Sequence, residues 1–231
     1  MTDTGWRPVK RTRAFEDVLA QIEQRIAEDG LAPGDRLPGE RQLAEQLQVG
    51  RSSVREALRV LETLGVVTSQ AGRGPDAGAV LTARPDSALT DLLRLHLGLA
   101  SWELREVIDT RLMIERWAAA GAAAARADTT ALAEALAGMS AARTAEEFVE
   151  HDTAFHCAIA EASGNRLIAA IMRSLRESVR RHAIEAVEQL GDTSVLQEDH
   201  RRILAAIASG SPEEAAEAVA GHLAHAYPTL F

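Results

Sequence analysis

The 231-residue sequence is poor in cysteine, in aromatic residues and in long apolar segments. Its single cysteine, Cys157, excludes an intramolecular disulfide and fits a reducing compartment. No run of 18 apolar residues is present, and the N-terminus has no apolar signal segment. We therefore expect no membrane span and a cytoplasmic location.

The sequence also lacks the excess of basic residues that is typical of nucleic-acid-binding proteins, since its formal net charge is −9. The charges are unevenly distributed. Residues 1–85 carry 12 basic and 12 acidic side chains, whereas residues 86–231 carry 13 and 22. This asymmetry predicts two domains with different partners, which we place at residues 1–82 and 89–231 with a linker at 83–88.

The first domain has the pattern of a winged helix-turn-helix. Apolar spacing predicts helices near residues 15–26, 40–47 and 51–64. Two β-rich segments, 66–68 and 79–81, flank a loop rich in glycine and proline and predict a hairpin.

Small and basic side chains gather where a recognition helix would enter the major groove of DNA. Arg51 and Arg55 lie one helical turn apart at that end. Arginine reads guanine with two hydrogen bonds, and serine suits a phosphate or a base. Each residue taken singly could be an ordinary solvated side chain, but the set in this order favours DNA binding. The candidate DNA-contacting residues are Arg41, Arg51, Ser52, Ser53, Arg55, Gly72 and Arg73.

The second domain is predicted to contain only helices, which makes the fold mainly α with a C-terminal antiparallel helical bundle. Helix periodicity and capping residues place these helices near residues 87–99, 101–126, 129–139, 145–162, 165–190, 193–209 and 212–227. Ser101, Asn165 and Ser211 are candidate N-caps.

Four polar residues lie on the apolar stripes of these helices. Asp152 and His156 are one turn apart, and His200 and His222 lie on the inner stripes of two further helices. Buried polar groups need partners, and one carboxylate with three imidazoles can share a divalent cation. Nitrogen and oxygen donors without thiolate suit zinc, nickel, cobalt or manganese rather than calcium, and we expect zinc first. The alternative is that each histidine is satisfied separately in the core.

Arg111 and His182 are candidate ligand-binding residues, because both lie on apolar stripes. Arginine can bind a carboxylate through two hydrogen bonds. For Arg111 the alternative is an internal pair with Glu115, one turn further along the helix. For His182 it is ordinary core packing. Cys157 is predicted to be a packed residue rather than a nucleophile.

Residues 37–44 (LPGERQLA) and 49–58 (VGRSSVREAL) resemble the GntR family of bacterial repressors. The family often has a hydroxyl residue where Gly50 stands. Residues 107–115 (VIDTRLMIE), 152–156 (DTAFH) and 200–204 (HRRIL) look like the helical effector domain of its FadR-type branch. Metal-dependent members of that branch supply an Asp and three His, which match the four residues above. Residues 74–83 are most similar to the wing of actinobacterial L-lactate-utilisation repressors.

The resemblance implies a homodimer on an inverted-repeat operator, whose affinity for DNA falls when a small organic acid binds near the metal. L-Lactate is one such effector, and a sugar acid or a fatty-acid-derived ligand is the alternative. A protein of another functional class, a metal-dependent enzyme fused to a DNA-binding domain, is the further alternative. Because the sequence offers no general base and no phosphate-binding loop beside the metal ligands, we expect a sensor and not an enzyme.

Overall fold

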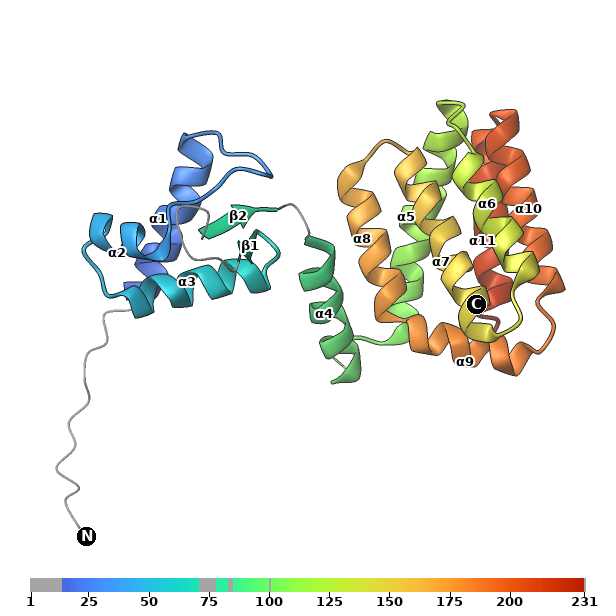
Figure 1. The fold of residues 1–231 in the computed structure, drawn as a ribbon. Coiled ribbons are helices and arrows are strands. Elements are labelled where there is room, and N and C mark those ends of the chain that lie inside the picture. The colour runs from blue at the N-terminus through green and yellow to red at the C-terminus, as the bar shows by residue number, and fades with distance from the viewer. Residues whose placement is uncertain (1–13, 71–77, 83–84, 100, 231) are drawn as a thin grey trace, which may run out of the picture. The chain divides into compact units, whose positions relative to one another are not determined.

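The computed structural model describes residues 14–70, 78–82, 85–99 and 101–230 of the chain (Figure 1). The chain divides into two compact units, Met1–Ala88 and Leu89–Phe231. Each unit has its own apolar core, so each is described by itself.

The N-terminal unit has the predicted order of elements. Its elements are α1 (Ala14–Glu28), α2 (Glu40–Gln46), α3 (Arg51–Thr63), β1 (Val67–Gln70) and β2 (Gly78–Leu81). The two strands pair antiparallel, with Val67 opposite Leu81. The tip of this hairpin, which carries the predicted wing residues Gly72 and Arg73, lies outside the described residues.

The core of this unit forms where the apolar stripes of α1 and α3 meet. Val18 and Ile22 of α1 are buried against Val54 and Leu61 of α3. Because this stripe faces inward, the opposite face of α3 is left to its polar side chains. Gly50 is the N-cap of α3 and makes no side-chain cap hydrogen bond, as expected for a residue without a hydroxyl.

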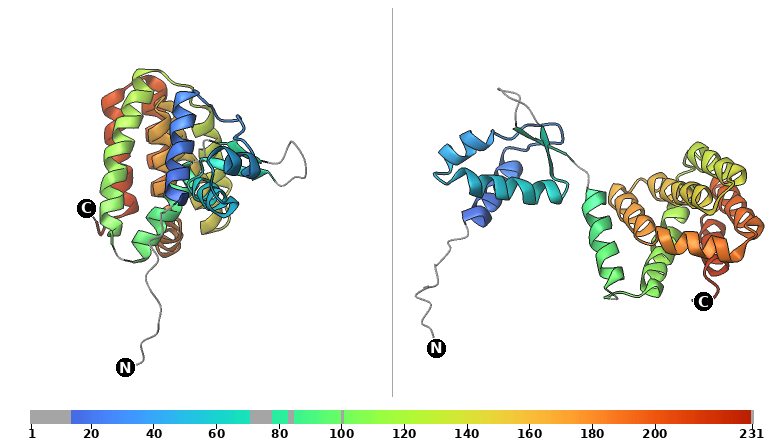
Figure 2. Two further views of the ribbon diagram at one scale, coloured as in Figure 1. Left: turned by 90° about the vertical axis from the view of Figure 1, so that its left-hand side faces the viewer. Right: turned by 60° about the horizontal axis from the view of Figure 1, so that its bottom comes forward.

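The C-terminal unit is entirely helical over its described residues. Helix α4 (Pro85–Gly98) begins just before the division at Leu89 and continues into this unit. The other elements are α5 (Leu104–Ala124), α6 (Thr130–Ala141), α7 (Ala145–Ala162), α8 (Arg166–Ser178), α9 (Arg180–Leu190), α10 (Ser194–Ser209) and α11 (Pro212–Ala226). Helix α5 contacts α7, α8, α10 and α11, and α10 and α11 lie side by side (Figure 2). This arrangement confirms the predicted mainly α fold with a helical bundle.

Small residues let the bundle helices approach one another closely. Ala118, Ala119, Ala122 and Ala123 of α5 are fully buried. Larger apolar side chains such as Ile203 fill the space between them. Asp152, His156, His200 and His222, which the sequence placed on inner stripes, are buried in this interior.

The predicted single helix over residues 165–190 is wrong, because the chain forms two helices there. The residue between them, Val179, has φ −104° and ψ 8°, which are not helical values. Val179 is fully buried with Val107 and Leu175. No glycine or proline marks this position, so the local sequence gives no signal, and packing against α5 accompanies the break.

Two helix starts also differ from their predicted positions. Pro85, placed in the linker, is the first residue of α4, where its fixed φ suits the first helical turn. Helix α5 begins at Leu104, and its N-cap is Glu103 instead of Ser101. Glu103 and Glu106 each accept a hydrogen bond from the other's backbone, which forms a capping box. The predicted N-cap Asn165 is confirmed, since its Oδ1 accepts from two backbone amides.

The described helices include none that is long and apolar enough to cross a membrane.

Candidate metal centre and effector pocket

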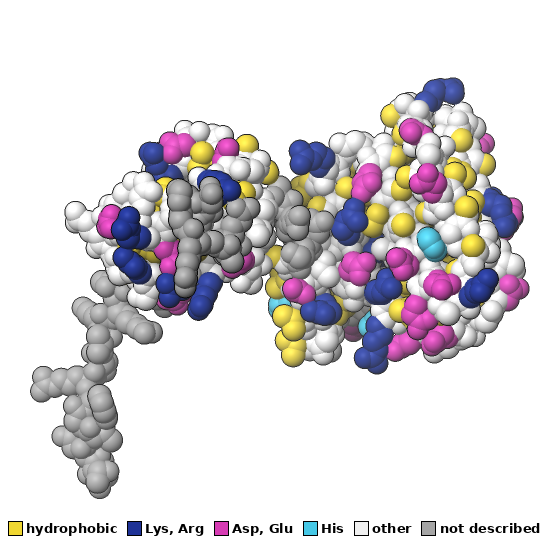
Figure 3. Space-filling model, in the orientation of Figure 1, with side chains coloured by type: hydrophobic (Ala, Val, Ile, Leu, Met, Phe, Trp, Pro, Cys, Tyr) yellow, Lys and Arg dark blue, Asp and Glu magenta, His cyan; other side chains and the backbone are white. Residues whose placement is uncertain are grey.

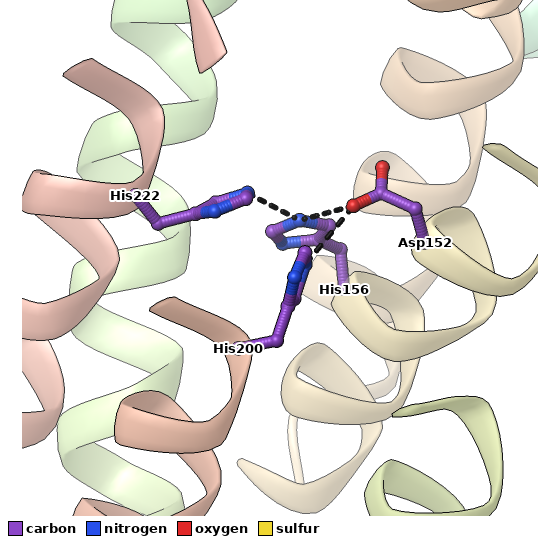
Figure 4. Close-up of side chains that lie close together, drawn as sticks. All are labelled: Asp152, His156, His200 and His222. Carbon is purple, nitrogen blue, oxygen red and sulfur yellow. Dashed lines mark hydrogen bonds and ion pairs between the residues drawn. The ribbon is translucent and has the colours of Figure 1, made fainter. Parts of the chain in front are cut away.

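The structure brings the four predicted metal ligands together inside the helical unit (Figure 4). Asp152 and His156 come from α7, His200 from α10 and His222 from α11. One ligand atom from each residue lies within 4.8 Å of the others, and all four residues are buried. In the described part of the chain, they form the one such group close enough to share an ion.

The converging atoms are ring nitrogens and one carboxylate oxygen. Asp152 Oδ1 lies 3.0 Å from His200 Nε2 and 3.5 Å from His156 Nε2. The Nε2 atoms of His156 and His222 are 3.2 Å apart. This is the donor set that the sequence predicted, presented from three helices.

Two of the histidines are oriented through their other ring nitrogen. His200 Nδ1 donates to the carbonyl oxygen of Leu196 at 2.6 Å, and His156 Nδ1 contacts Glu115 Oε2. Because a carbonyl or a carboxylate can only accept, the proton of each neutral ring must be on Nδ1. The lone pair of each Nε2 is therefore directed at the centre of the cluster.

These lone pairs fit a cation. His200 Nε2 faces Asp152 Oδ1, yet the two atoms do not have hydrogen-bond geometry, and His222 Nδ1 has no hydrogen-bond partner either. Burial holds the pKa of His222 well below its ordinary value, so this ring is neutral. A neutral imidazole can serve as a metal ligand, so the donor set fits a divalent cation.

The carboxylate of Asp152 is ionised despite its burial. Burial raises its pKa, but the charge of Arg176 outweighs that effect and holds the pKa well below its ordinary value. Asp152 Oδ2 contacts Arg176, which leaves Oδ1 directed at the histidines. The negative charge that a cation requires is therefore present.

Sequence reasoning missed Arg176, although its signal was present. Arg176 follows Met172 by four residues and precedes Val179 by three, so it lies on an apolar stripe. The side chain is 3% exposed, and its Nε has no hydrogen-bond partner.

Arg111 and Glu115 form the internal pair that the sequence offered as one alternative. Arg111 Nε donates to Glu115 Oε1 at 2.9 Å, and both side chains are buried. Burial opposes the charge of Glu115, but His156 and Arg111 outweigh it and lower the pKa of this carboxyl to about 2. Arg111 Nη1 lies 3.4 Å from Tyr227 Oη, and Nη2 has no hydrogen-bond partner. The pair thus leaves one buried donor available.

A cavity of about 400 Å³ adjoins the cluster. Arg111, Arg176, Asp152 and His222 line it, so the available guanidinium donors and the candidate metal ligands face one space. His182 also lines this cavity, but it is exposed and therefore lies at the rim instead of in the core. The volume lies within the range of small-molecule sites.

The predicted DNA-contacting residues that are described lie at the starts of α2 and α3. Arg41, Arg51, Ser52 and Arg55 are exposed, and Ser53 is half-buried. On the face seen in Figure 3, basic and acidic side chains of this unit lie beside one another. Attraction to DNA would therefore come from a few placed arginines rather than from a uniformly basic surface.

Comparisons with known proteins agree with this architecture. Residues 14–75 match the family described as bacterial regulatory proteins, gntR family, and residues 106–225 match the FCD domain. The HTH-type transcriptional repressor NanR of Cronobacter sakazakii is 31% identical over 97% of this chain and 88% of its own. The HTH-type transcriptional regulator LutR of Bacillus subtilis is 32% identical over 87% of this chain and 93% of its own.

A solved structure, the GntR protein of Streptococcus agalactiae, superimposes with a TM-score of 0.61 at 24% identity, covering 94% of this chain and 98% of that one. It supports the fold alone. The relatives are transcription regulators, which excludes the enzyme alternative. The chain belongs to the GntR family of bacterial transcription regulators, in the FadR-type branch with a helical FCD domain.

Proposed function

We propose that this protein is a repressor whose binding to operator DNA is controlled by a small carboxylate bound beside a divalent metal ion. One observation carries the proposal. The unpaired Nη2 of Arg111 and the candidate ligands Asp152 and His222 line one cavity. Such a cavity can hold a carboxylate between a metal and a guanidinium.

The ion would be held by Asp152, His156, His200 and His222, with zinc as the first choice and nickel or manganese as alternatives. When bound, a divalent cation supplies positive charge and coordination positions for a carboxylate oxygen. Arg111 would donate to the same carboxylate, while Glu115 keeps its guanidinium in place. His182 would contact the outer part of the effector at the rim.

DNA would be read as a double-stranded inverted repeat by a homodimer, with Arg41, Arg51, Ser52, Ser53 and Arg55 entering the grooves. Gly72 and Arg73 would approach from the wing. We place the DNA-binding domain at residues 1–82, the linker at 83–88 and the effector domain at 89–231. Since operator DNA lies in the bacterial cytoplasm, the protein would act there.

Regulation requires that the effector bind one dimer state more tightly than the other, because a ligand with equal affinity for both shifts nothing. In this proposal the effector favours a dimer state in which the spacing of the two recognition helices no longer matches the spacing of the operator half-sites. L-Lactate is our first candidate effector, and a sugar acid or a fatty-acid-derived acid is the alternative.

A thermal-shift screen of small carboxylates on the zinc-loaded full chain tests the proposal, because a ligand of the native state raises apparent stability. L-Lactate, sugar acids and short fatty acids form the three arms. We expect one arm to raise the melting temperature with the metal bound and to leave it unchanged after chelation. The same acid should release a duplex that the protein selects from a randomised library. Shifts that are equal with and without metal would contradict the proposal.

A further inference from the structure

The guanidinium of Arg55 on α3 is held by a carboxylate from the neighbouring helix α2. Arg55 Nε lies 3.2 Å from both Glu40 Oε1 and Oε2, and Nη2 lies 2.8 Å from Oε2. The pair is a two-pronged ion pair between the first residue of α2 and the fifth residue of α3. It therefore fixes the plane of the guanidinium as well as its position.

The pair with Glu40 occupies the Nε–Nη2 edge of the guanidinium and leaves the Nη1–Nη2 edge available. Of the five N–H donors of arginine, Glu40 takes the one on Nε and one on Nη2. The two Nη1 donors and the second Nη2 donor have no hydrogen-bond partner within the described residues. Two donors on one edge are what the O6 and N7 atoms of guanine accept in the major groove.

The carboxylate of Glu40 contributes little to the stability of the fold, and it does not attract DNA. The side chains of Arg55 and Glu40 are 53% and 40% exposed, and exposed ion pairs contribute little to folding. The hydrogen bond from Arg55 holds the pKa of Glu40 below its ordinary value, so the carboxyl is ionised at neutral pH. A negative charge near the start of a recognition helix repels phosphates.

What Glu40 supplies is orientation. A free arginine samples many rotamers, and ordering it on binding costs conformational entropy. An arginine that is already fixed by a carboxylate reaches a base edge without that loss. When the operator carries an incorrect base pair, the fixed guanidinium cannot turn away and bind a phosphate instead, so the mismatch costs affinity.

We propose that Glu40 is a positioning residue for sequence recognition, which holds Arg55 by its Nε–Nη2 edge so that the Nη1–Nη2 edge reads a base pair. This inference rests on the proposed DNA contact of Arg55. According to this inference, Glu40 increases discrimination between base pairs but lowers the affinity for DNA in general.

The test uses the full chain and a duplex that the wild-type protein selects from a randomised library. Fluorescence anisotropy gives the affinity for this duplex, for each single-base-pair substitution of it and for a random-sequence duplex. The variants are Glu40→Gln, Glu40→Asp, Arg55→Ala and the double variant Glu40→Gln/Arg55→Ala. Glu56→Gln is the matched control, because it removes the same charge from an exposed position next to Arg55.

We expect Arg55→Ala to lose discrimination at a particular base pair. Glu40→Gln should reduce discrimination at that same base pair by about tenfold while binding the random duplex at least as tightly as the wild type. Glu40→Asp keeps the charge but shortens the side chain, so it should lose discrimination without binding the random duplex more tightly. The double variant should match Arg55→Ala, and Glu56→Gln should keep full discrimination.

Two results would overturn the inference, and they are distinguishable. If Glu40→Gln and Glu40→Asp keep wild-type discrimination while Arg55→Ala loses it, Arg55 reads DNA and Glu40 does not position it. If Arg55→Ala keeps wild-type discrimination at every base pair, the proposed DNA contact of Arg55 is itself wrong. Unchanged thermal unfolding of each variant shows that the comparison concerns folded protein.

Discussion

His156 and His222 face each other through their Nε2 atoms, 3.2 Å apart, in the interior of the helical unit. The Nδ1 of His156 contacts Glu115, so the facing nitrogen of His156 carries a lone pair. Burial lowers the pKa of His222, which keeps that ring neutral. A shared cation would offset the desolvation of these two nitrogens.

The first prediction concerns metal content. Replacing His200 and His222 by alanine removes two of the four candidate ligands, and we expect the metal to fall from about one ion per chain to a small fraction of that value. Mass spectrometry of the dialysed protein measures it. His96→Ala is the control, since His96 lies against Trp102 on another part of the unit and should leave metal content unchanged. Full metal content in the double variant would show that these residues are not the ligands.

The second prediction concerns Arg111. Arg111→Lys keeps the positive charge beside Glu115 but removes the fork of N–H donors, so we expect effector affinity to fall by about tenfold or more. Metal content should stay the same, because Arg111 is not a metal ligand. The shift of melting temperature against effector concentration measures the change.

Arg116→Lys is the matched control for this change, since Arg116 is an exposed residue of the same helix that pairs with Glu217 at 2.7 Å. It should bind the effector like the wild type. Equal effector affinity in Arg111→Lys and Arg116→Lys would remove Arg111 from the effector site.

The third prediction tests the close approach of α6 and α7. A Cβ added at Gly138 would lie 2.3 Å from Nδ1 of His151, so the imidazole packs directly on the backbone of α6. We expect Gly138→Ala to lower the free energy of unfolding by about 1–3 kcal/mol. Urea denaturation measures it, with the metal state held constant.

The sign should reverse when the obstructing ring is removed. In a His151→Ala background, Gly138→Ala should raise the free energy of unfolding by about 0.5–1 kcal/mol, because alanine is the better helix residue. A loss of the same size in both backgrounds would mean that the clash is not with His151.

The fourth prediction concerns the single thiol. Burial raises the pKa of Cys157 to about 11, so the reactive thiolate is scarce at pH 8, and the side chain is 4% exposed. We expect a thiol reagent such as Ellman's reagent to react slowly with the native protein and rapidly once it is unfolded in guanidinium. Rapid stoichiometric reaction of the native protein at pH 8 would contradict this assignment.

The sequence by itself determined much of the fold and the choice of candidate metal ligands, because both depend on local periodicity. Apolar residues at helical spacing identified the helices, and the same spacing showed that Asp152, His156, His200 and His222 interrupt inner stripes. Charged and polar residues on such stripes are informative because burial without a partner is costly. Periodicity fixes the face of a helix on which each residue lies.

Only the tertiary structure decided which faces meet. Arg176 contacts Asp152, and Arg55 pairs with Glu40, across helices whose contact no local spacing specifies. The break between α8 and α9 at Val179 is likewise not marked by local spacing. The unpaired Nη2 of Arg111 is likewise a result of geometry, since the sequence could not distinguish a fully satisfied ion pair from one that leaves a donor available. Packing between residues that are far apart in the sequence sets the distances in these contacts. The same packing places the guanidinium donors and the candidate metal ligands on which the proposed function depends.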